Sequence, residues 1–175
     1  MANRSVELAA FIRDIPDFPR PGVLFRDITP LLADAGTLAT AVNALATPFA
    51  HAGIDVVAAV EARGFIFGAA VARALNAGFV PIRKKGKLPH EKESVMYELE
   101  YGTDIVEVHR DSVGPGVRVL MVDDVLATGG TMAACCRLME NLGAEITGLS
   151  FLIELTALAG RDKLSKYPIN VVITY

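Results

Sequence analysis

Two adjacent carboxylates, Asp123 and Asp124, follow a buried-looking apolar run in the stretch VLMVDDVLATGGT, residues 119–131. Like charges in contact repel each other, so the pair calls for a chemical reason. Directly behind it lie small residues, two hydroxyls and unobstructed backbone amides, namely Ala127, Thr128, Gly129, Gly130 and Thr131. Carboxylates accept hydrogen bonds from sugar hydroxyls, and amides at the start of a helix attract a phosphate. The stretch therefore predicts a site for a diol beside a phosphate, as in a ribose 5-phosphate.

The place of this stretch at the end of a predicted strand favours a ligand site. We expect a buried strand at 117–123 and a helix at 130–142. In an open parallel sheet the ligand crevice lies beyond the carboxyl ends of the strands. Because successive strand residues point to opposite faces, we expect the two carboxylates to diverge at the strand end instead of repelling at contact distance. The alternative is an ordinary strand-to-helix turn with a capping Asp or Thr, but the length of the pattern favours the ligand site.

Apolar strands and helices alternate along the rest of the chain. We further expect helices at 5–15, 34–51 and 65–76, strands at 54–60, 78–83 and 145–155, two strands around Gly102 within 88–110, and a last helix before a strand at 169–174. Closely spaced prolines predict a stiff, extended loop without regular structure over 16–30. The alternation predicts an α/β fold whose mostly parallel sheet is flanked by helices, with a few antiparallel additions, in a single domain spanning 1–175.

Composition narrows the classes of function. The net charge of -3 and the pI near 5.6 argue against bulk binding of nucleic acid. No apolar run reaches the length of about 18 residues that a membrane span needs, and the charged N-terminus is unlike a signal peptide, so we expect a cytoplasmic protein without membrane contact. Neither a Walker loop nor a G-x-G-x-x-G turn after a strand is present, which removes support for ATP hydrolysis and dinucleotide binding. Cys135 and Cys136 are neighbours without metal or disulfide spacing, and we expect them to pack in the core.

The stretch at 119–131 resembles the phosphoribosyl pyrophosphate (PRPP) signature of the type I phosphoribosyltransferases, in which hydrophobic residues precede two acids and T-G-G-T follows. Further segments resemble, in the same order and across nearly the whole chain, the members of the family that use adenine: PDFPRPGVLFRDITPLL, EARGFIFG, IRKKGKLP, YELEYGTD and ELTALAGRDKL. The resemblance implies a type I phosphoribosyltransferase-like fold with a small hood at 1–33 and a mobile active-site loop at 86–102. It implies transfer of ribose 5-phosphate from PRPP to adenine, giving AMP and pyrophosphate in purine salvage, by a homodimer. Magnesium (Mg2+) is expected as cofactor, held through PRPP and water and not by a protein metal site.

The resemblance also assigns roles to residues on the PRPP side. Asp123 and Asp124 would hold the ribose hydroxyls, and the loop at 127–131 would bind the 5-phosphate. Glu61 and Ala62, with the catalytic candidate Arg63, match the pyrophosphate loop, where Arg63 would lie over the purine; a surface ion pair is the alternative for Arg63. The resemblance places a basic run near pyrophosphate, either within one subunit or across the dimer interface. In this chain the run consists of Arg83, Lys84 and Lys87, and a solvated face is the alternative.

On the base side, Leu24, Phe25 and Arg26 match the segment that packs on adenine, although Phe25 could instead belong to the core. Leu24 stands where a smaller β-branched residue is also common in the family, so base preference is the least secure part of the comparison. Glu100 and Tyr101 match the loop that closes over the site, and Glu100 is the candidate acid on the purine ring; a strand-end Glu without a task is the alternative. Two other functions stay open, namely a phosphoribosyltransferase for another purine base and a PRPP-sensing regulator of the same fold.

Overall fold

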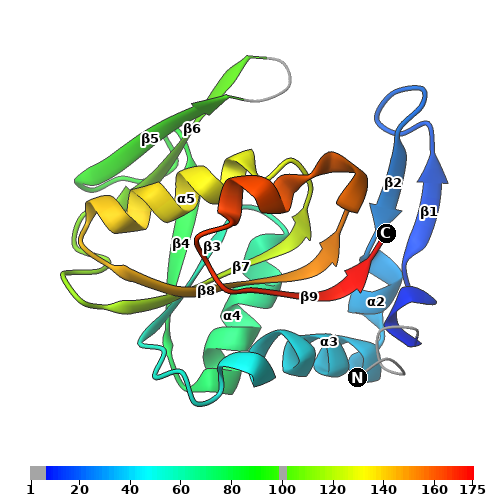
Figure 1. Cartoon of the computed structure of the whole chain (residues 1–175), viewed down its shortest axis with the longest axis horizontal. Helices are drawn as coiled ribbons and strands as arrows, with labels where there is room; N and C mark the ends of the chain where they lie inside the picture. The colour runs from blue at the N-terminus through cyan, green and yellow to red at the C-terminus, as the bar shows by residue number, and fades with distance from the viewer. Residues whose placement is uncertain (1–6, 99–101) are drawn as a thin grey trace.

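A seven-stranded sheet forms the centre of the protein in the computed structural model, which describes residues 7–98 and 102–175 (Figure 1). The strand order is β5-β6-β4-β3-β7-β8-β9. Five neighbouring strands run parallel: β4 (Gly78–Lys84), β3 (Val56–Val60), β7 (Arg118–Leu126), β8 (Glu145–Glu154) and β9 (Ile169–Thr174). The strands β5 (Lys92–Glu98) and β6 (Thr103–His109) extend the sheet antiparallel beyond β4. The prediction of a mostly parallel sheet with antiparallel additions is confirmed.

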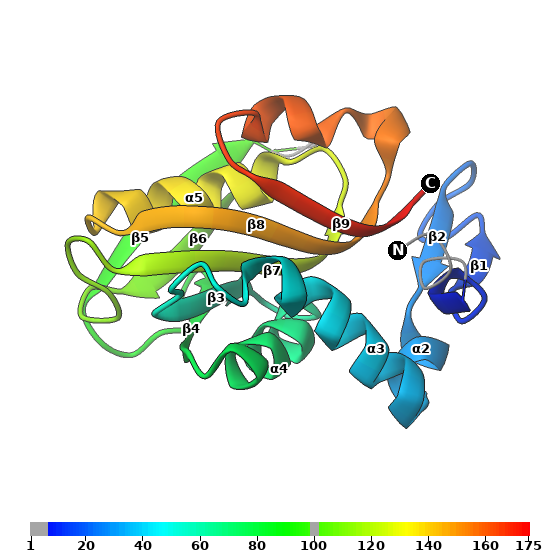
Figure 2. The same cartoon turned by 60° about the horizontal axis from the view of Figure 1, so that its bottom comes forward.

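Helices cover both faces of the sheet (Figure 2). One face carries α3 (Ala35–Ala46), which continues into the short 3-10 helix η1 (Thr47–Phe49), and α4 (Gly64–Leu75); the other carries α5 (Gly130–Asn141). Side chains of the central strand β7 contribute to the apolar core on both faces of the sheet. Leu120 packs towards α3 and α4, and Met121 packs towards α5. Such two-sided burial explains why the parallel strands read as continuous apolar runs. In the described part of the chain, no helix is both long and apolar enough to cross a membrane.

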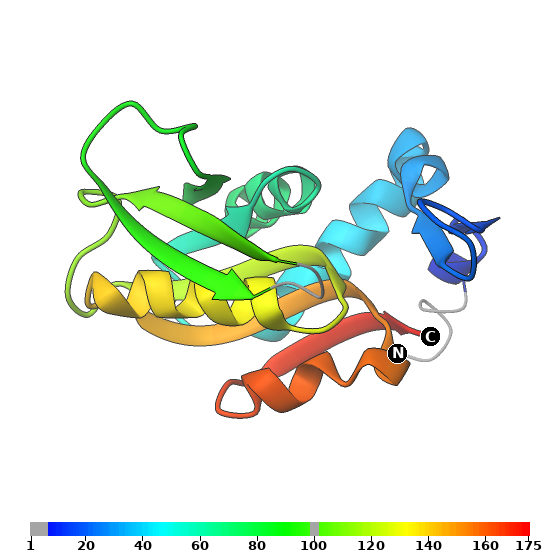
Figure 3. The same cartoon turned by 90° about the horizontal axis from the view of Figure 1, so that it is seen from above.

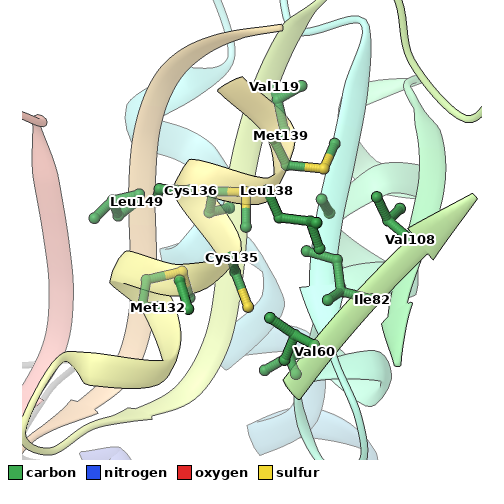
Figure 4. Close-up of a cluster of buried hydrophobic side chains, with 14 of the residues drawn as sticks. Val60, Ile82, Val108, Val119, Met132, Cys135, Cys136, Leu138, Met139 and Leu149 are labelled. Atoms are coloured by element: carbon green, nitrogen blue, oxygen red, sulfur yellow. The ribbon is translucent and has the colours of Figure 1, made fainter. Parts of the chain in front are cut away.

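The core beneath α5 contains both cysteines (Figure 4). Cys135 and Cys136 are fully buried free thiols that lie among Met132, Leu138 and other apolar side chains. Burial raises the pKa of Cys135 well above its usual value and the pKa of Cys136 to about 12. The prediction that these residues pack in the core is confirmed.

The N-terminal segment differs from the prediction of a helix at 5–15 followed by a structureless loop. Residues 7–9 are helical, and the chain then forms a two-stranded antiparallel sheet of β1 (Arg13–Pro16) and β2 (Leu24–Asp27), followed by α2 (Thr29–Ala33). Prolines lack a backbone amide, but here none of them is needed as a donor in the ladder. Pro19 and Pro21 lie in the connection between the two strands, and Pro16 is the last residue of β1. The prediction therefore fails. We call residues 7–33 the hood.

Two further segments shape the surroundings of α5. The hairpin of β5 and β6 lies against α5, as the green strands and the yellow helix show in Figure 3. The predicted last helix is instead a pair of short 3-10 helices, η2 (Thr156–Leu158) and η3 (Gly160–Leu164), and η3 contacts α5. Gly160 and the positive φ of 50° at Ala159 interrupt the turn between them, which explains why no regular α-helix forms.

Candidate active site

The acid pair lies within β7 and not at its end. The strand continues past the carboxylates to Leu126, with Asp123 paired to Phe151 and Val125 to Ile153 of β8. The prediction of a strand end at Asp123 is therefore wrong, because backbone pairing with β8 outweighs the low strand preference of aspartate. Asp123 and Asp124 are both inaccessible to most solvent, and the Asp124 amide donates a hydrogen bond of 2.9 Å to Asp123 Oδ1.

Burial makes the two carboxylates hard to ionise. It raises the pKa of Asp123 well above its ordinary value, and the charge of Asp124 raises it further. Burial also raises the pKa of Asp124, although the nearby Arg63 guanidinium opposes the shift. Strand alternation thus does not remove the repulsion between the two groups, contrary to the expectation from their positions. A ligand that brings hydrogen-bond donors or positive charge would relieve this repulsion.

Asp124 also has an unsatisfied oxygen. Arg63 Nε lies 2.8 Å from Asp124 Oδ2, yet this oxygen is buried and accepts no hydrogen bond of good geometry from any described residue. A buried acceptor without a donor costs free energy, so it marks a place where a ligand hydroxyl or a water belongs. Arg63 does form an ion pair, and the pair lies only partly on the surface: the Arg63 side chain is 41% exposed, whereas that of Asp124 is 7% exposed.

The loop that follows β7 exposes the start of α5. Gly129 adopts φ 74°, a value that favours glycine, and it caps α5 without a side-chain hydrogen bond. The amides of the first helical turn have no acceptor within the helix, and the helix dipole makes this end positive. The loop at 127–131 therefore presents backbone amides at the positive end of a helix, a setting that suits an anion.

A cavity of about 410 Å³ brings most of the predicted PRPP residues together. It is lined by Glu61, Ala62, Arg63, Lys84, Asp123, Asp124, Ala127, Thr128, Gly129, Gly130 and Thr131, together with a few apolar neighbours. These residues come from the carboxyl ends of β3, β4 and β7 and from the start of α5. The position agrees with the rule that ligands bind beyond the carboxyl ends of parallel strands.

Glu61 is engaged by the neighbouring strand more than by the cavity. Its carboxylate accepts a hydrogen bond from the Lys84 amide and lies 3.3 Å from Arg83 Nε, and its peptide bond to Ala62 is cis. Burial alone would raise the pKa of Glu61, but the Lys84 amide and Arg83 outweigh it and lower the pKa. Glu61 thus links the ends of β3 and β4. Arg83 and Lys87 do not line the cavity, unlike Lys84.

Lys84 is held by two residues that the sequence did not single out. Its ammonium group pairs with the Asp104 carboxylate and lies 3.1 Å from the Tyr97 hydroxyl. Burial would lower the pKa of Lys84, but these two partners outweigh it and raise the pKa. Tyr97 and Asp104 face each other across the β5–β6 ladder. In the sequence, only the register of β5 against β6 could have revealed this pair. That register depends on where the turn between the two strands lies.

The predicted base-contact residues divide into two groups. Phe25 faces the site, since Arg63 Cζ lies 5.2 Å from its ring centroid and Phe18 packs edge-to-face against it at 5.2 Å. Arg26 turns away from the cavity: it pairs with Asp14 and lies 3.6 Å over the ring of Tyr175. Leu24 is exposed, and none of the three residues from 24 to 26 lines the cavity. Glu100 and Tyr101 lie outside the described residues.

Comparisons with known proteins agree with this geometry. A family model described as "Phosphoribosyl transferase domain" matches residues 27–174. An adenine phosphoribosyltransferase from Rhodopirellula baltica is 58% identical over 97% of this chain and 82% of its own length. The crystal structure of adenine phosphoribosyltransferase from Thermoanaerobacter pseudethanolicus has 50% identity and a TM-score of 0.95, covering 98% of this chain and 99% of that chain. The enzyme from Saccharomyces cerevisiae, solved with an imino-altritol bisphosphate and adenine, has 39% identity and a TM-score of 0.93, with coverage of 98% and 99%. The chain belongs to the adenine phosphoribosyltransferases of the phosphoribosyl transferase family.

Proposed function

We propose that this chain transfers the phosphoribosyl group of PRPP to adenine, forming AMP and pyrophosphate in purine salvage. Ring nitrogen N9 of adenine attacks the anomeric carbon, the bond from that carbon to the pyrophosphate oxygen breaks, and the proton that the imidazole ring loses passes to the carboxylate of Glu100, the proposed proton carrier. One observation carries the proposal: an acid pair with an unsatisfied oxygen on the buried Asp124 shares a cavity with an open helix start. A ribose diol beside a 5-phosphate satisfies both features at once.

On the PRPP side, Asp123 and Asp124 accept hydrogen bonds from the ribose hydroxyls, and the amides and hydroxyls at 127–131 bind the 5-phosphate. Arg63 and Lys84 supply positive charge where the pyrophosphate leaves. Their ion pairs with Asp124 and Asp104 support this role, because each cation is already oriented at the wall of the cavity before substrate arrives. Glu61 acts indirectly: its carboxylate accepts a hydrogen bond from the Lys84 amide and so helps to hold Lys84 in place.

Magnesium fits this site as a partner of PRPP. Within residues 7–98 and 102–175, no cluster of three or more His, Cys, Asp or Glu side chains is arranged to hold a metal ion. The unsatisfied oxygen of Asp124 suits a water or hydroxyl in the coordination shell of a hydrated Mg2+ that PRPP oxygens hold. When bound, the ion supplies positive charge that stabilises the departing pyrophosphate.

On the base side, Phe25 and Arg63 offer an aromatic face and a planar cation for the purine, which supports adenine binding between the hood and the cavity. Glu100 remains the proposed acid on the purine ring and Tyr101 its neighbour, both carried by the proposed closing loop at 86–102. Glu100→Gln keeps the size of the side chain and removes its titrating proton. We expect kcat to fall roughly a hundred-fold or more, as for loss of a general acid or base, with little change in PRPP affinity.

We also propose that the enzyme works as a homodimer in the cytoplasm. Arg83 and Lys87 do not line the cavity of their own subunit, as expected of residues that serve the site of a partner. Ile66 of α4 is an exposed large apolar side chain, which suits an interface. The free thiols of Cys135 and Cys136 suit a reducing compartment. Analytical ultracentrifugation of the purified chain tests the dimer.

The decisive experiment measures AMP formation from adenine and PRPP with magnesium, with hypoxanthine and guanine as competing bases. Adenine presents an amino group where the other two present an oxygen, so a pocket that accepts from the amino group discriminates strongly against them. We expect adenine to be preferred by much more than about ten-fold in kcat/KM. Comparable use of hypoxanthine would assign the chain to another purine base, and no turnover with any base would leave only a binding function.

A further inference from the structure

Two glycines that are far apart in the sequence place their backbones in direct contact beside the phosphate loop. A Cβ atom built on Gly160 would lie 2.1 Å from the Ala127 carbonyl oxygen and 2.9 Å from the Gly129 nitrogen. A Cβ atom on Gly129 would lie 2.3 Å from the Gly160 carbonyl oxygen. All of these distances are below any normal contact, so neither position has room for a side chain.

The two glycines are required for different reasons. Gly129 has φ 74°, so its backbone conformation favours glycine even without a neighbour. Gly160 is not among the glycines with positive φ. Alanine at position 160 therefore meets no conformational penalty of this kind, and its only effect is the added methyl group against Ala127 and Gly129.

The segment that carries Gly160 is anchored by two residues that follow this glycine, Arg161 and Leu164, and cannot easily retreat. Arg161 donates to both oxygens of Glu154, with Nε 3.0 Å from Oε1 and Nη2 2.7 Å from Oε2. Glu154 ends β8 and is paired in register with Leu126, the last residue of β7. Further along the same segment, Leu164 is fully buried in the core beneath α5.

We propose that Gly160 is a positioning residue that holds the backbone of the phosphate loop at the spacing required for the 5-phosphate of PRPP. This inference rests on the proposed function of the loop at 127–131. Ala127 and Gly129 line the cavity on one side and touch Gly160 on the other. A methyl group at 160 therefore displaces the loop at the expense of the bound phosphate, and adenine binding, which involves the hood, stays unaffected.

The test compares Gly160→Ala with the wild type in AMP formation at varied PRPP and varied adenine. A displacement of about 1 Å in a binding group lowers activity roughly a hundred-fold. We expect most of this loss as a raised KM for PRPP, with the KM for adenine close to that of the wild type. Binding of ribose 5-phosphate, followed by calorimetry, should weaken in parallel.

Two other glycines provide matched controls for the added methyl group. A Cβ atom on Gly148 would lie 2.3 Å from Cε1 of Phe49, a clash of similar severity that lies in the packing of β8. Gly148→Ala should lower Tm and leave the KM for PRPP unchanged. Gly114 has nothing within 4 Å of its built Cβ, so Gly114→Ala should change neither quantity. A raised KM for PRPP in Gly148→Ala, equal to that in Gly160→Ala, would mean general loosening and would overturn the proposal.

If Gly160→Ala does not fold, Arg161→Lys provides a second test of whether this segment positions the phosphate loop. It keeps the positive charge beside Glu154 but loses the bidentate geometry, so the segment can shift away from the loop. We expect the KM for PRPP to rise several-fold, without a comparable change for adenine. A folded Gly160→Ala enzyme, or failing that Arg161→Lys, with wild-type KM for PRPP would overturn the proposal. Wild-type protein that forms no AMP would instead refute the proposed function itself.

Discussion

The acid pair is the residue-level feature that distinguishes this cavity from an ordinary strand-to-helix turn. A capping aspartate would accept hydrogen bonds from nearby helix amides. Asp124 instead keeps an oxygen without a hydrogen bond among the described residues, and Asp123 lies half-buried beside it. The free protein tolerates this arrangement because Arg63 compensates part of the charge. Both carboxylates are thereby available to a ligand.

Replacement of either carboxylate by an amide should weaken PRPP binding. Hydrogen bonds from hydroxyls to a charged group contribute about 1.5–3 kcal/mol each. Asp123→Asn and Asp124→Asn should therefore raise the KM for PRPP by roughly ten- to a hundred-fold. Steady-state kinetics at saturating adenine measure the effect. Unchanged PRPP kinetics in both variants would remove the ribose hydroxyls from this part of the site.

The same substitution at Asp123 should make the ligand-free protein more stable. The pKa of Asp123 is higher in the folded than in the unfolded chain, so the folded protein binds a proton that the unfolded chain has lost. Folding stability therefore falls as pH rises from the ordinary Asp value of 3.8 through the raised pKa. Asp123→Asn removes this dependence and should raise the folding stability at pH 7, with a smaller gain as pH falls.

Thermal unfolding of wild type and variant between pH 4 and pH 7 measures this gain. Asp111, an exposed aspartate in the turn after β6, supplies the matched control Asp111→Asn, which should leave Tm unchanged. If Asp123→Asn were less stable than the wild type at pH 7, the carboxylate would be contributing to the fold instead of opposing it.

At the scale of elements, the sequence predicted what depends on local pattern and missed what depends on pairing. The strands β3, β4, β7 and β8 were found because burial on both faces gives each an apolar run. The sheet of β1 and β2 was missed because its pairing across a proline-rich connection leaves no periodic signal.

The candidate site divides in the same way. The acids and the loop at 127–131 are contiguous, so one motif revealed them. The contacts of Lys84 with Asp104 and of Gly129 with Gly160 join separate elements, and only the fold brings them together.

The hood is held to the rest of the molecule partly by one side-chain contact. Arg26 of β2 lies over the ring of Tyr175, which follows β9. A cation–π contact of this kind contributes about 0.5–1 kcal/mol at a partly exposed site. Tyr175→Ala should loosen the hood and raise the KM for adenine roughly two- to five-fold, with no change for PRPP.

The matched control is Tyr175→Phe, which keeps the ring and should behave as the wild type. Competition with AMP gives a second readout, since the proposed site would place this product against both the hood and the phosphate loop. An equal effect on adenine and PRPP in Tyr175→Ala would show that the residue stabilises the whole fold and not the hood.

At the scale of the whole molecule, the sheet separates two apolar layers that share its central strands. Cys135 and Cys136 lie in the layer beneath α5, with no solvent exposure. Burial also holds the pKa of Cys136 at about 12, which leaves little thiolate at neutral pH. Native protein should therefore resist a thiol reagent, whereas both thiols should react in denaturant. Rapid labelling of the native protein would show that α5 detaches from the sheet in solution.

The raised pKa values of the acid pair also couple substrate binding to the solvent. A ligand that places hydroxyl donors and a hydrated cation on Asp123 and Asp124 favours their ionised forms, so at any pH where the free pair binds a proton, ligand binding should release it. The heat of PRPP binding should then depend on the ionisation enthalpy of the buffer, and more strongly as the pH falls. Proton release would then accompany the binding of PRPP itself.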